Sequence, residues 1–322
     1  MMRSASNPVT TSTKSAVSCA LVEGPAAPGW IMPWLHRDES RKPASRISHD
    51  VELTVADAWT FAQVRMRDVA HASRPQFEAA VSAAYAQLAA ALRQGRHQQP
   101  VRFWNYVPRL LDPADDADAN RNRYMVFNAA RHQALEQWFA TADIQPRLVA
   151  ASAVDAHSDD LVVHVLAGGE RPQAIENPRQ RPAYRYSPTY GPIPPSFARG
   201  SLIIGDAAFG SPMLLTAGTA SVVGEETRHD NDLPGQLHET ELNLTALVAA
   251  AMPPGGATSD AMKRFKHIRA YFSRPDDRHI LQAKLPDMFP HASAIELMPA
   301  VLCRPGLVVE IEGIADLGAV QP

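Results

Sequence analysis

The 322-residue chain is 45% hydrophobic and 20% charged, with a formal net charge of −3. These values are typical of a globular protein with two domains, or one domain with a large annex. The negative balance argues against a nucleic-acid partner, because such binding requires a basic excess that neutralises several phosphates. Cys19 and Cys303 are the only cysteines, too few for a disulfide framework or a cysteine-based zinc site. We expect a cytoplasmic protein without a membrane partner, since the apolar stretch at 15–22 is far too short to span a bilayer.

The N-terminal half begins with residues 1–45, which are rich in Ser, Thr, Pro and Ala and predict an irregular tail. Apolar residues at helical spacing predict an amphipathic helix over 77–92. The aromatic and β-branched run at 101–107 predicts a strand, and a second helix is expected from about 121 to 140. The two-residue period of the strand places three side chains on one face, Arg102, Trp104 and Tyr106.

The same order of helix, strand and helix returns over 236–252, 265–272 and 276–285. This duplication predicts two related modules of an α+β fold, with the helices on one face of each mixed sheet. Further strands are predicted at 147–154, 160–167, 201–206, 213–223, 294–302 and 307–313. The expected divisions are the tail at 1–45, an abbreviated N-terminal module at 46–143 and a C-terminal module at 144–322.

A long connection rich in Pro, Arg and Tyr separates the strands predicted at 160–167 and 201–206. Structureless connections of this length are uncommon in a compact domain unless they have a function, and prolines reduce the entropy lost on ordering. Two interpretations are open. The segment is either a surface loop of polyproline character or a stiff wall that brings arginines and tyrosines toward a small anion.

Several common catalytic motifs are not present in the sequence. HETEL at 238–242 lacks the second histidine of a zinc-binding helix, because Leu242 stands in that position. No phosphate-binding loop, dinucleotide fingerprint or GxSxG elbow occurs. We therefore expect an enzyme without a metal or nucleotide cofactor.

Three other features carry possible chemistry. Arg131 falls on the apolar stripe of the 121–140 helix, and a buried guanidinium needs either a protein carboxylate or a ligand carboxylate as its partner. Glu310 and Glu312 share one face of the last strand, where one acid can line a cleft with a raised pKa suited to proton donation. In the run 214–224, Gly218 permits close backbone approach to a ligand, or a tight bend in the core.

Together these segments resemble the chorismatase family. The matching segments span about two-thirds of the chain in the family's order. They are RFWNY (102–106), RYMVF with the following Arg131, ENPRQRPAYRYSPTYGPIPPSFAR (176–199), AGTASVVG (217–224), HET with Asn243 and Leu244, and LCRPGLVVEIEG (302–313).

This resemblance implies two modules similar to the YjgF/RidA and chorismate mutase folds, in a monomeric chain that uses no cofactor. It also implies cleavage of chorismate to pyruvate and a cyclic acid, with Glu310 protonating the methylene carbon of the enolpyruvyl ether. Gly218 and Cys303 occupy positions typical of members that make 3-hydroxybenzoate, and some 4-hydroxybenzoate is also expected. The expected catalytic residues are Glu310 and Cys303. The expected substrate-binding residues are Tyr106, Tyr124, Arg131, Arg179, Tyr184, Tyr186, Tyr190, Arg199, Gly218 and Thr219.

Other outcomes remain open at this point. A hydrolytic member would give a dihydroxycyclohexadiene carboxylate, and an altered homologue would act on, or only bind, another aromatic acid. The family's FCxGR reads FNAAR here, with Asn128 and Ala130 in place of Cys and Gly, and its VGH reads VGE with Glu225. A third carboxylate beside an anion site would weaken dianion binding unless it points away.

Overall fold

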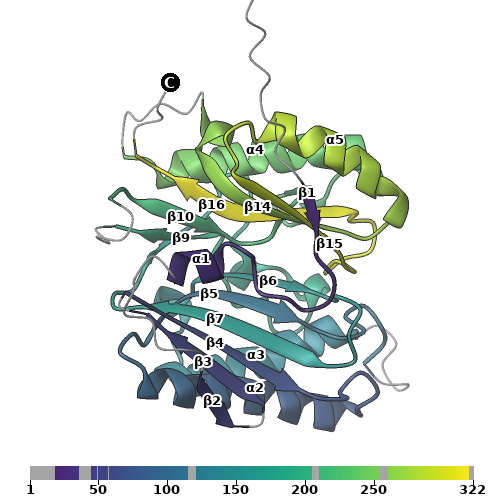
Figure 1. The fold of residues 1–322 in the computed structure, drawn as a ribbon. Helices are drawn as coiled ribbons and strands as arrows, with labels where there is room; N and C mark the ends of the chain where they lie inside the picture. Colours follow the sequence, from purple (N-terminus) through teal and green to yellow (C-terminus); the bar gives the residue numbers. More distant parts are fainter. Residues whose placement is uncertain are drawn as a thin grey trace, which may run out of the picture.

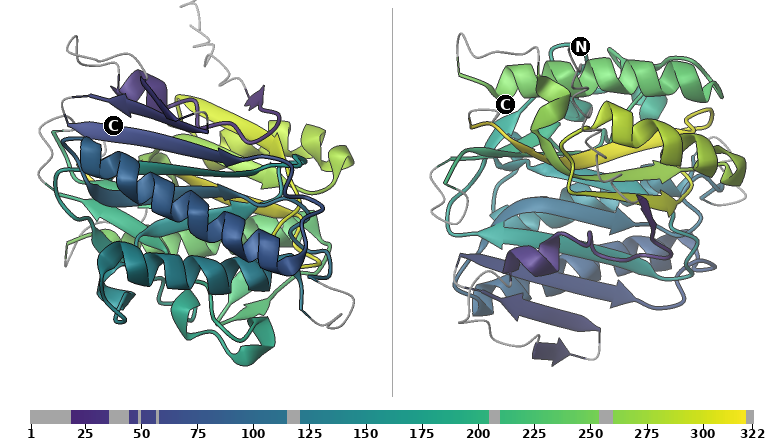
Figure 2. Two further views of the ribbon diagram at one scale, coloured as in Figure 1. Left: turned by 90° about the horizontal axis from the view of Figure 1, so that it is seen from below. Right: turned by 45° about the horizontal axis from the view of Figure 1, so that its top comes forward.

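A computed structural model shows two sheets packed face to face, with helices covering both outer faces (Figure 1). The two further views show α2 and α3 side by side under one sheet and α4 and α5 over the other (Figure 2). The α+β class, with helices on one face of each mixed sheet, is therefore confirmed. The structure describes residues 19–35, 45–48, 50–56, 58–114, 121–204, 210–253 and 260–318.

The N-terminal sheet has six strands in the order β2-β3-β4-β7-β5-β6. Its outer face is covered by α2 and α3, whose apolar stripes build one core with it. The elements are β2 (Ser45–Ser48), β3 (Val51–Val55), β4 (Trp59–Met66), α2 (Arg74–Gln94), β5 (Gln99–Tyr106), α3 (Arg123–Phe139), β6 (Ala150–Val154) and β7 (Leu161–Gly168).

The C-terminal sheet follows the order β1-β15-β14-β16-β10-β9-β8, with β11 also paired to β16. A second core lies between this sheet and the helices α4 and α5. The elements are β1 (Cys19–Leu21), β8 (Gln173–Ile175), β9 (Gly200–Ile203), β10 (Met213–Thr216), β11 (Thr219–Ala220), β12 (Val222–Val223), β13 (Glu226–Thr227), α4 (Leu233–Ala251), β14 (Phe265–Phe272), α5 (Arg278–Met288), β15 (Ala294–Pro299) and β16 (Val309–Asp316).

The expected module boundary after residue 143 is wrong. Both β6 and β7 belong to the N-terminal sheet, and β7 is its central strand between β4 and β5. In sequence β6 and β7 follow α3, so a boundary drawn at the end of this helix cuts them off from their own sheet. The N-terminal module therefore extends to about residue 168.

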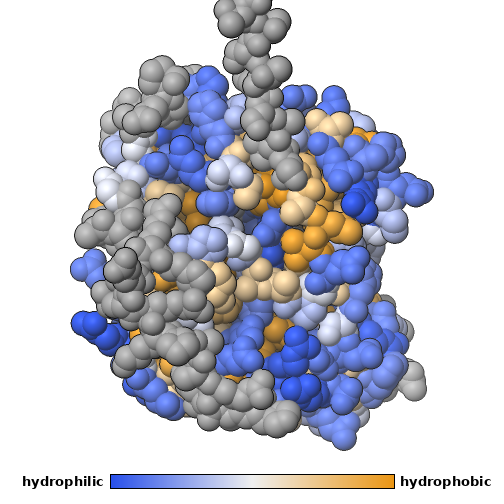
Figure 3. Space-filling model, viewed as in Figure 1, coloured by the Kyte–Doolittle hydropathy of each residue, from blue (hydrophilic) through white to orange (hydrophobic). Residues whose placement is uncertain are grey.

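The expectation of an irregular tail over 1–45 is wrong for its described part. Residues 19–21 form β1, which pairs in parallel with β15, and residues 31–35 form the short helix α1. Ile31 and Leu35 pack into the core between the two sheets. Apolar side chains reach the surface along this junction near β1 and β15 (Figure 3). β1 is a short edge strand that pairs with β15 through its backbone. Its side chains therefore need not show the two-residue period from which strands are predicted.

The remaining elements agree with the sequence pattern in most places. The four helices and the strands at 101–107 and 265–272 are confirmed. The run at 213–223 is not one strand but three short pieces, β10, β11 and β12. β3 and β4 were not predicted, although both are central to the N-terminal sheet. None of the helices in the described ranges is both long and apolar enough to cross a membrane.

A buried ion pair joins the two sheets. Arg102 on β5 donates to the Glu312 carboxylate on β16 at 2.7 Å, and the Trp104 indole donates to the other carboxylate oxygen at 2.7 Å. The Arg102 and Glu312 side chains are only 1% and 5% exposed. The face of β5 predicted to carry Arg102, Trp104 and Tyr106 therefore lies in the contact between the modules.

We predict that Glu312→Gln lowers the free energy of unfolding by about 3–5 kcal/mol, because it leaves the Arg102 charge buried without a counter-charge. Urea unfolding followed by circular dichroism measures the effect. Glu78→Gln, which removes the exposed ion pair with Arg74, is the control and should cost less than about 1 kcal/mol. Equal stability of the Glu312 variant and the wild type would contradict the assigned role.

Candidate active site

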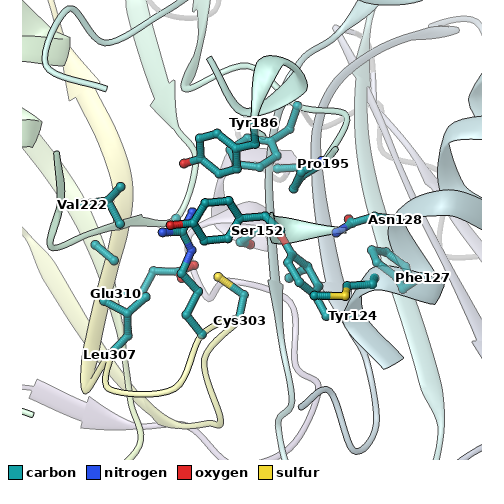
Figure 4. Close-up of a pocket in the computed structure, with 18 of the residues that line it drawn as sticks. Tyr124, Phe127, Asn128, Ser152, Tyr186, Pro195, Val222, Cys303, Leu307 and Glu310 are labelled. Atoms are coloured by element: carbon teal, nitrogen blue, oxygen red, sulfur yellow. The ribbon is translucent and has the colours of Figure 1, made fainter. Parts of the chain in front are cut away.

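A cavity of about 320 Å³ lies between the two modules, within the size range of small-molecule sites. Its walls come from α3, from the 176–199 segment, from the 218–222 run and from the loop before β16 (Figure 4). Glu310 and Leu307 lie on one side, and Tyr124, Phe127 and Asn128 lie on the other.

Glu310 is the acid of this cavity. β16 is hydrogen-bonded between β14 and β11, and Glu310 lies opposite Ala220 across the second pairing. Burial, and secondarily the charge of Glu312, raises the pKa of Glu310 to about 8, against the opposing effects of Arg102, Arg199 and Arg304. The carboxyl therefore holds its proton at neutral pH, as a general acid requires.

Gly218 leaves the space that the Glu310 carboxyl occupies. A Cβ atom built on Gly218 would lie 1.7 Å from Oε1 and 2.6 Å from the carboxyl carbon of Glu310. Any larger residue would push this carboxyl out of its position. Gly218 therefore permits a close approach, as predicted, but the group that approaches it is the Glu310 side chain and not a ligand.

Cys303 lies beside the acid in the same cavity. Burial, and then the nearby Glu310 charge, raises the pKa of Cys303 to about 12. The side chain is therefore a neutral thiol at physiological pH, and a thiolate nucleophile has no support here. Its contribution is to shape the wall next to Glu310.

Three arginines line the cavity, and none has a carboxylate ion-pair partner among the described residues. Arg131 on α3 donates to the Tyr85 hydroxyl and the Ser196 carbonyl oxygen. Its guanidinium is buried with neutral partners only, although a buried charge normally needs compensation. The site therefore has an excess of positive charge that an anionic ligand would neutralise.

Arg199 and Arg304 supply the other two charges. Arg199 donates to the Tyr186 hydroxyl, and Arg304 lies over the Tyr190 ring at 4.0 Å and over the Tyr186 ring at 5.0 Å. Tyr186 and Tyr190 pack against each other with ring centroids 5.3 Å apart. This aromatic and cationic cluster forms the wall expected from the 176–199 segment.

Comparisons with known proteins found similar chains and a similar fold. The N-terminal region of the FkbO/Hyg5-like chorismatases matches residues 36–167. A 3-hydroxybenzoate synthase from Streptomyces hygroscopicus is 29% identical over 246 residues, covering 74% of this chain and 70% of that protein. A chorismatase from the same species is 27% identical over 282 residues, covering 85% and 76%. A chorismatase crystal structure superimposes with a TM-score of 0.70 and 24% identity, over 85% of this chain and 80% of that one.

The chain is similar to the chorismatases over most of its length. Its departures from the family's motifs lie in different surroundings. Ala130 is buried in the core of the N-terminal module and does not line the cavity, whereas Asn128 does. The cavity is therefore altered at Asn128 and left unchanged by Ala130.

Glu225, the third departure, does not line the cavity. Its carboxylate accepts from the Ser187 backbone N–H at 3.0 Å and pairs with Arg181 at 3.2 Å. Its carbonyl oxygen accepts from Arg304 at 2.6 Å. Because Ser187 lies between the two wall tyrosines in sequence, this contact holds the wall.

Most of the site residues predicted from the sequence meet at the cavity. They are Tyr124, Arg131, Tyr186, Tyr190, Arg199, Gly218, Cys303 and Glu310. Others predicted to bind substrate do not line it. Arg179 pairs with Glu239 at 2.6 Å, and Tyr106 donates to the Ala26 carbonyl oxygen between the sheets.

Tyr184 and Thr219 are also placed outside the cavity lining. Tyr184 packs at the edge of the N-terminal core with Arg185 over its ring, and Thr219 donates to the Ala217 carbonyl oxygen. For both, and for Tyr106 and Arg179, motif membership placed the residue near the site without indicating its direction. The structure therefore does not bring these four residues to the cavity lining.

The polar cavity residues outside the predicted site include Arg304, Asn128 and Gln180. Asn128 Nδ2 and Gln180 Oε1 are buried without a hydrogen-bond partner among the described residues. Arg304 directly follows Cys303 in a motif already noted, so its position was a usable signal. No signal in the sequence marked the amides as unpaired. In the described ranges, no cluster of three or more His, Cys, Asp or Glu side chains could hold a metal ion.

Proposed function

We propose that the protein cleaves chorismate to pyruvate and 3-hydroxybenzoate, with Glu310 as the general acid. One observation carries this proposal. A glutamic acid that is protonated at neutral pH faces a cavity with three arginines that lack carboxylate partners among the described residues. The activity named for the Streptomyces hygroscopicus synthase supports the choice of product.

The charges of the cavity fit chorismate. This substrate carries two carboxylates on an apolar ring, so it needs cations at two points and aromatic walls between them. Arg131 lies on the α3 side, and Arg199 and Arg304 lie with the two tyrosines. A protonated Glu310 adds no negative charge that would repel the dianion.

Catalysis begins with proton transfer from Glu310 to the methylene carbon of the enolpyruvyl ether. Protonation places positive charge on the adjacent ether carbon, and this carbon becomes the ketone carbon of pyruvate. The buried carboxyl is suited to this step, because its raised pKa keeps the proton available while remaining low enough to release it.

The product depends on what replaces the ether oxygen. In the route to 3-hydroxybenzoate the neighbouring ring hydroxyl displaces that oxygen, and loss of a ring proton completes aromatisation. No water is consumed, because chorismate has the same atoms as 3-hydroxybenzoate plus pyruvate. Gly218 leaves room for the Glu310 carboxyl, and the Cys303 side chain takes up space beside it, which we infer limits access of an attacking water.

The direct test is incubation of the purified protein with chorismate. Pyruvate release is followed with lactate dehydrogenase, and ring products are resolved by chromatography. We expect equal amounts of pyruvate and 3-hydroxybenzoate, in EDTA-treated and untreated protein alike. A protein that releases no pyruvate would refute the proposal, and activity that returns only with a divalent ion would refute the cofactor-free mechanism.

Glu310→Gln should lower kcat by about 10²–10⁴-fold, since the amide cannot donate the required proton. Binding of 3-hydroxybenzoate should be retained, because the arginines stay in place. In the wild type, kcat/KM should fall as pH rises through about 8, since the acid must be protonated and its pKa lies there.

The matched control for Glu310 is Glu176→Gln. Burial raises the pKa of Glu176 to about 7, yet this side chain does not line the cavity. Glu176 is close to Arg199, so the control can change KM, but it should keep the alkaline limb near pH 8 that belongs to Glu310. An active Glu310 variant with an unchanged pH profile would remove this residue from the mechanism.

Gly218→Ala and Cys303→Ala should shift the product ratio toward the dihydroxycyclohexadiene carboxylate. The first displaces the Glu310 carboxyl and the second opens space beside it, so water competes better with the ring hydroxyl. A barrier difference of about 1.4 kcal/mol changes such a ratio tenfold. The ratio of the two ring products is measured at equal pyruvate release. An unaltered ratio in both variants would show that these residues do not determine the product.

A further inference from the structure

Asn128 presents an unsatisfied hydrogen-bond donor to the cavity. The side chain is 2% exposed, lines the cavity, and projects into it from α3 (Figure 4). Its Nδ2 has no hydrogen-bond partner among the described residues. A buried donor left unpaired is costly, so a partner is expected when the cavity is filled.

The protein offers one candidate partner, and its geometry is poor. The Asn128 side chain lowers the pKa of Tyr124 through a hydrogen-bonding interaction with its hydroxyl, but Nδ2 forms no hydrogen bond of good distance and angle with any described residue. Burial raises the pKa of Tyr124 well above its usual value, so its hydroxyl remains neutral. The Asn128 donor is thus left for a ligand.

The neighbourhood of Asn128 indicates which part of a ligand it meets. Arg131 is three residues further along α3, so the two side chains share one face of the helix and both reach the cavity. The cavity cations that act on the Glu310 carboxyl are Arg199 and Arg304. The cavity therefore has two polar ends, one on α3 and one beside Glu310.

The proposed reaction fixes the substrate between these ends. The methylene carbon and the pyruvyl carboxylate of chorismate are attached to the same carbon atom, so both must lie near Glu310. The ring carboxylate is at the other end of the molecule. We propose that Asn128 donates a hydrogen bond from Nδ2 to this ring carboxylate, beside Arg131, and thereby selects substrates that carry an anion on the ring.

This role rests on the proposed function and adds a specificity residue to it. An amide contributes a directed donor without changing the charge of the site, whereas a thiol is only a weak donor. The Asn128 donor and the Arg131 charge would hold both oxygens of one carboxylate. Substrates without that carboxylate would leave both groups unpaired, which is a strong basis for rejection.

The test uses 3-hydroxybenzoate, which carries the ring carboxylate but no enolpyruvyl group, and 3-hydroxybenzyl alcohol, which lacks the carboxylate. By titration calorimetry, Asn128→Ala should weaken binding of the acid about tenfold, as expected for loss of a hydrogen bond to a charged group. Asn128→Asp should weaken it further, because a carboxylate would repel the ligand. Binding of the alcohol should differ little between wild type and Asn128→Ala.

Kinetics with chorismate should show a matching change. In Asn128→Ala we expect KM to rise about tenfold while kcat stays within about twofold, since the contact is equal in ground and transition states. Asn128→Asp variants that bind 3-hydroxybenzoate as tightly as wild type would overturn the assignment, because the amide would then be an acceptor. Tyr124→Phe reproducing the losses of Asn128→Ala would also overturn it, by identifying Tyr124 as the true partner.

The two proposals fail in different ways. If the wild type releases no pyruvate from chorismate, the proposed function is lost and the role of Asn128 with it. If the wild type is active while Asn128→Ala and Asn128→Asp match it in KM and in affinity for 3-hydroxybenzoate, only the role of Asn128 is refuted.

Discussion

The Glu312 carboxylate, held by Arg102 and the Trp104 indole, joins the two sheets directly beside the cavity. Glu310 lies two residues earlier on the same face of β16, so the position of the acid depends on this contact. Glu312 also acts on Glu310 electrostatically. Burial is the main cause of the raised pKa of Glu310, and the charge of Glu312 is the second. The interaction that docks the modules therefore also helps to keep the acid protonated.

Neither module contains the cavity alone. α3 of the N-terminal module supplies Arg131 and Asn128, whereas β16 and its preceding loop supply Glu310, Cys303 and Arg304. Substrate contacts and the proton donor thus come from different modules, and their separation is set by the core between the sheets. A substitution deep in that core can alter the geometry of the reaction without touching the ligand.

Much of the fold could be predicted because helical and strand periods record burial in the local sequence, as over 77–92 and 101–107. Glu310 and Arg131 could be placed for the same reason, since both stand on periodic elements. The outer strand β1 and the boundary near residue 168 could not, because backbone pairing over long sequence separations leaves little local signal. The directions of side chains in the irregular 176–199 segment could not be predicted either, and Arg179 and Tyr184 lie outside the cavity lining.

The arginines of the 176–199 segment differ in whether a protein carboxylate pairs with them. Arg179 and Arg181 are neutralised by Glu239 and Glu225, so they stiffen the segment and do not attract a ligand. Arg199 forms no ion pair within the described ranges, although its charge acts on the nearby Glu176 and on Glu310, and it lines the cavity. The sequence shows only a run of arginines, whereas the fold divides them between holding the wall and facing the ligand. Glu225 belongs to the first group, because its carboxylate pairs with Arg181 and accepts from the Ser187 backbone N–H.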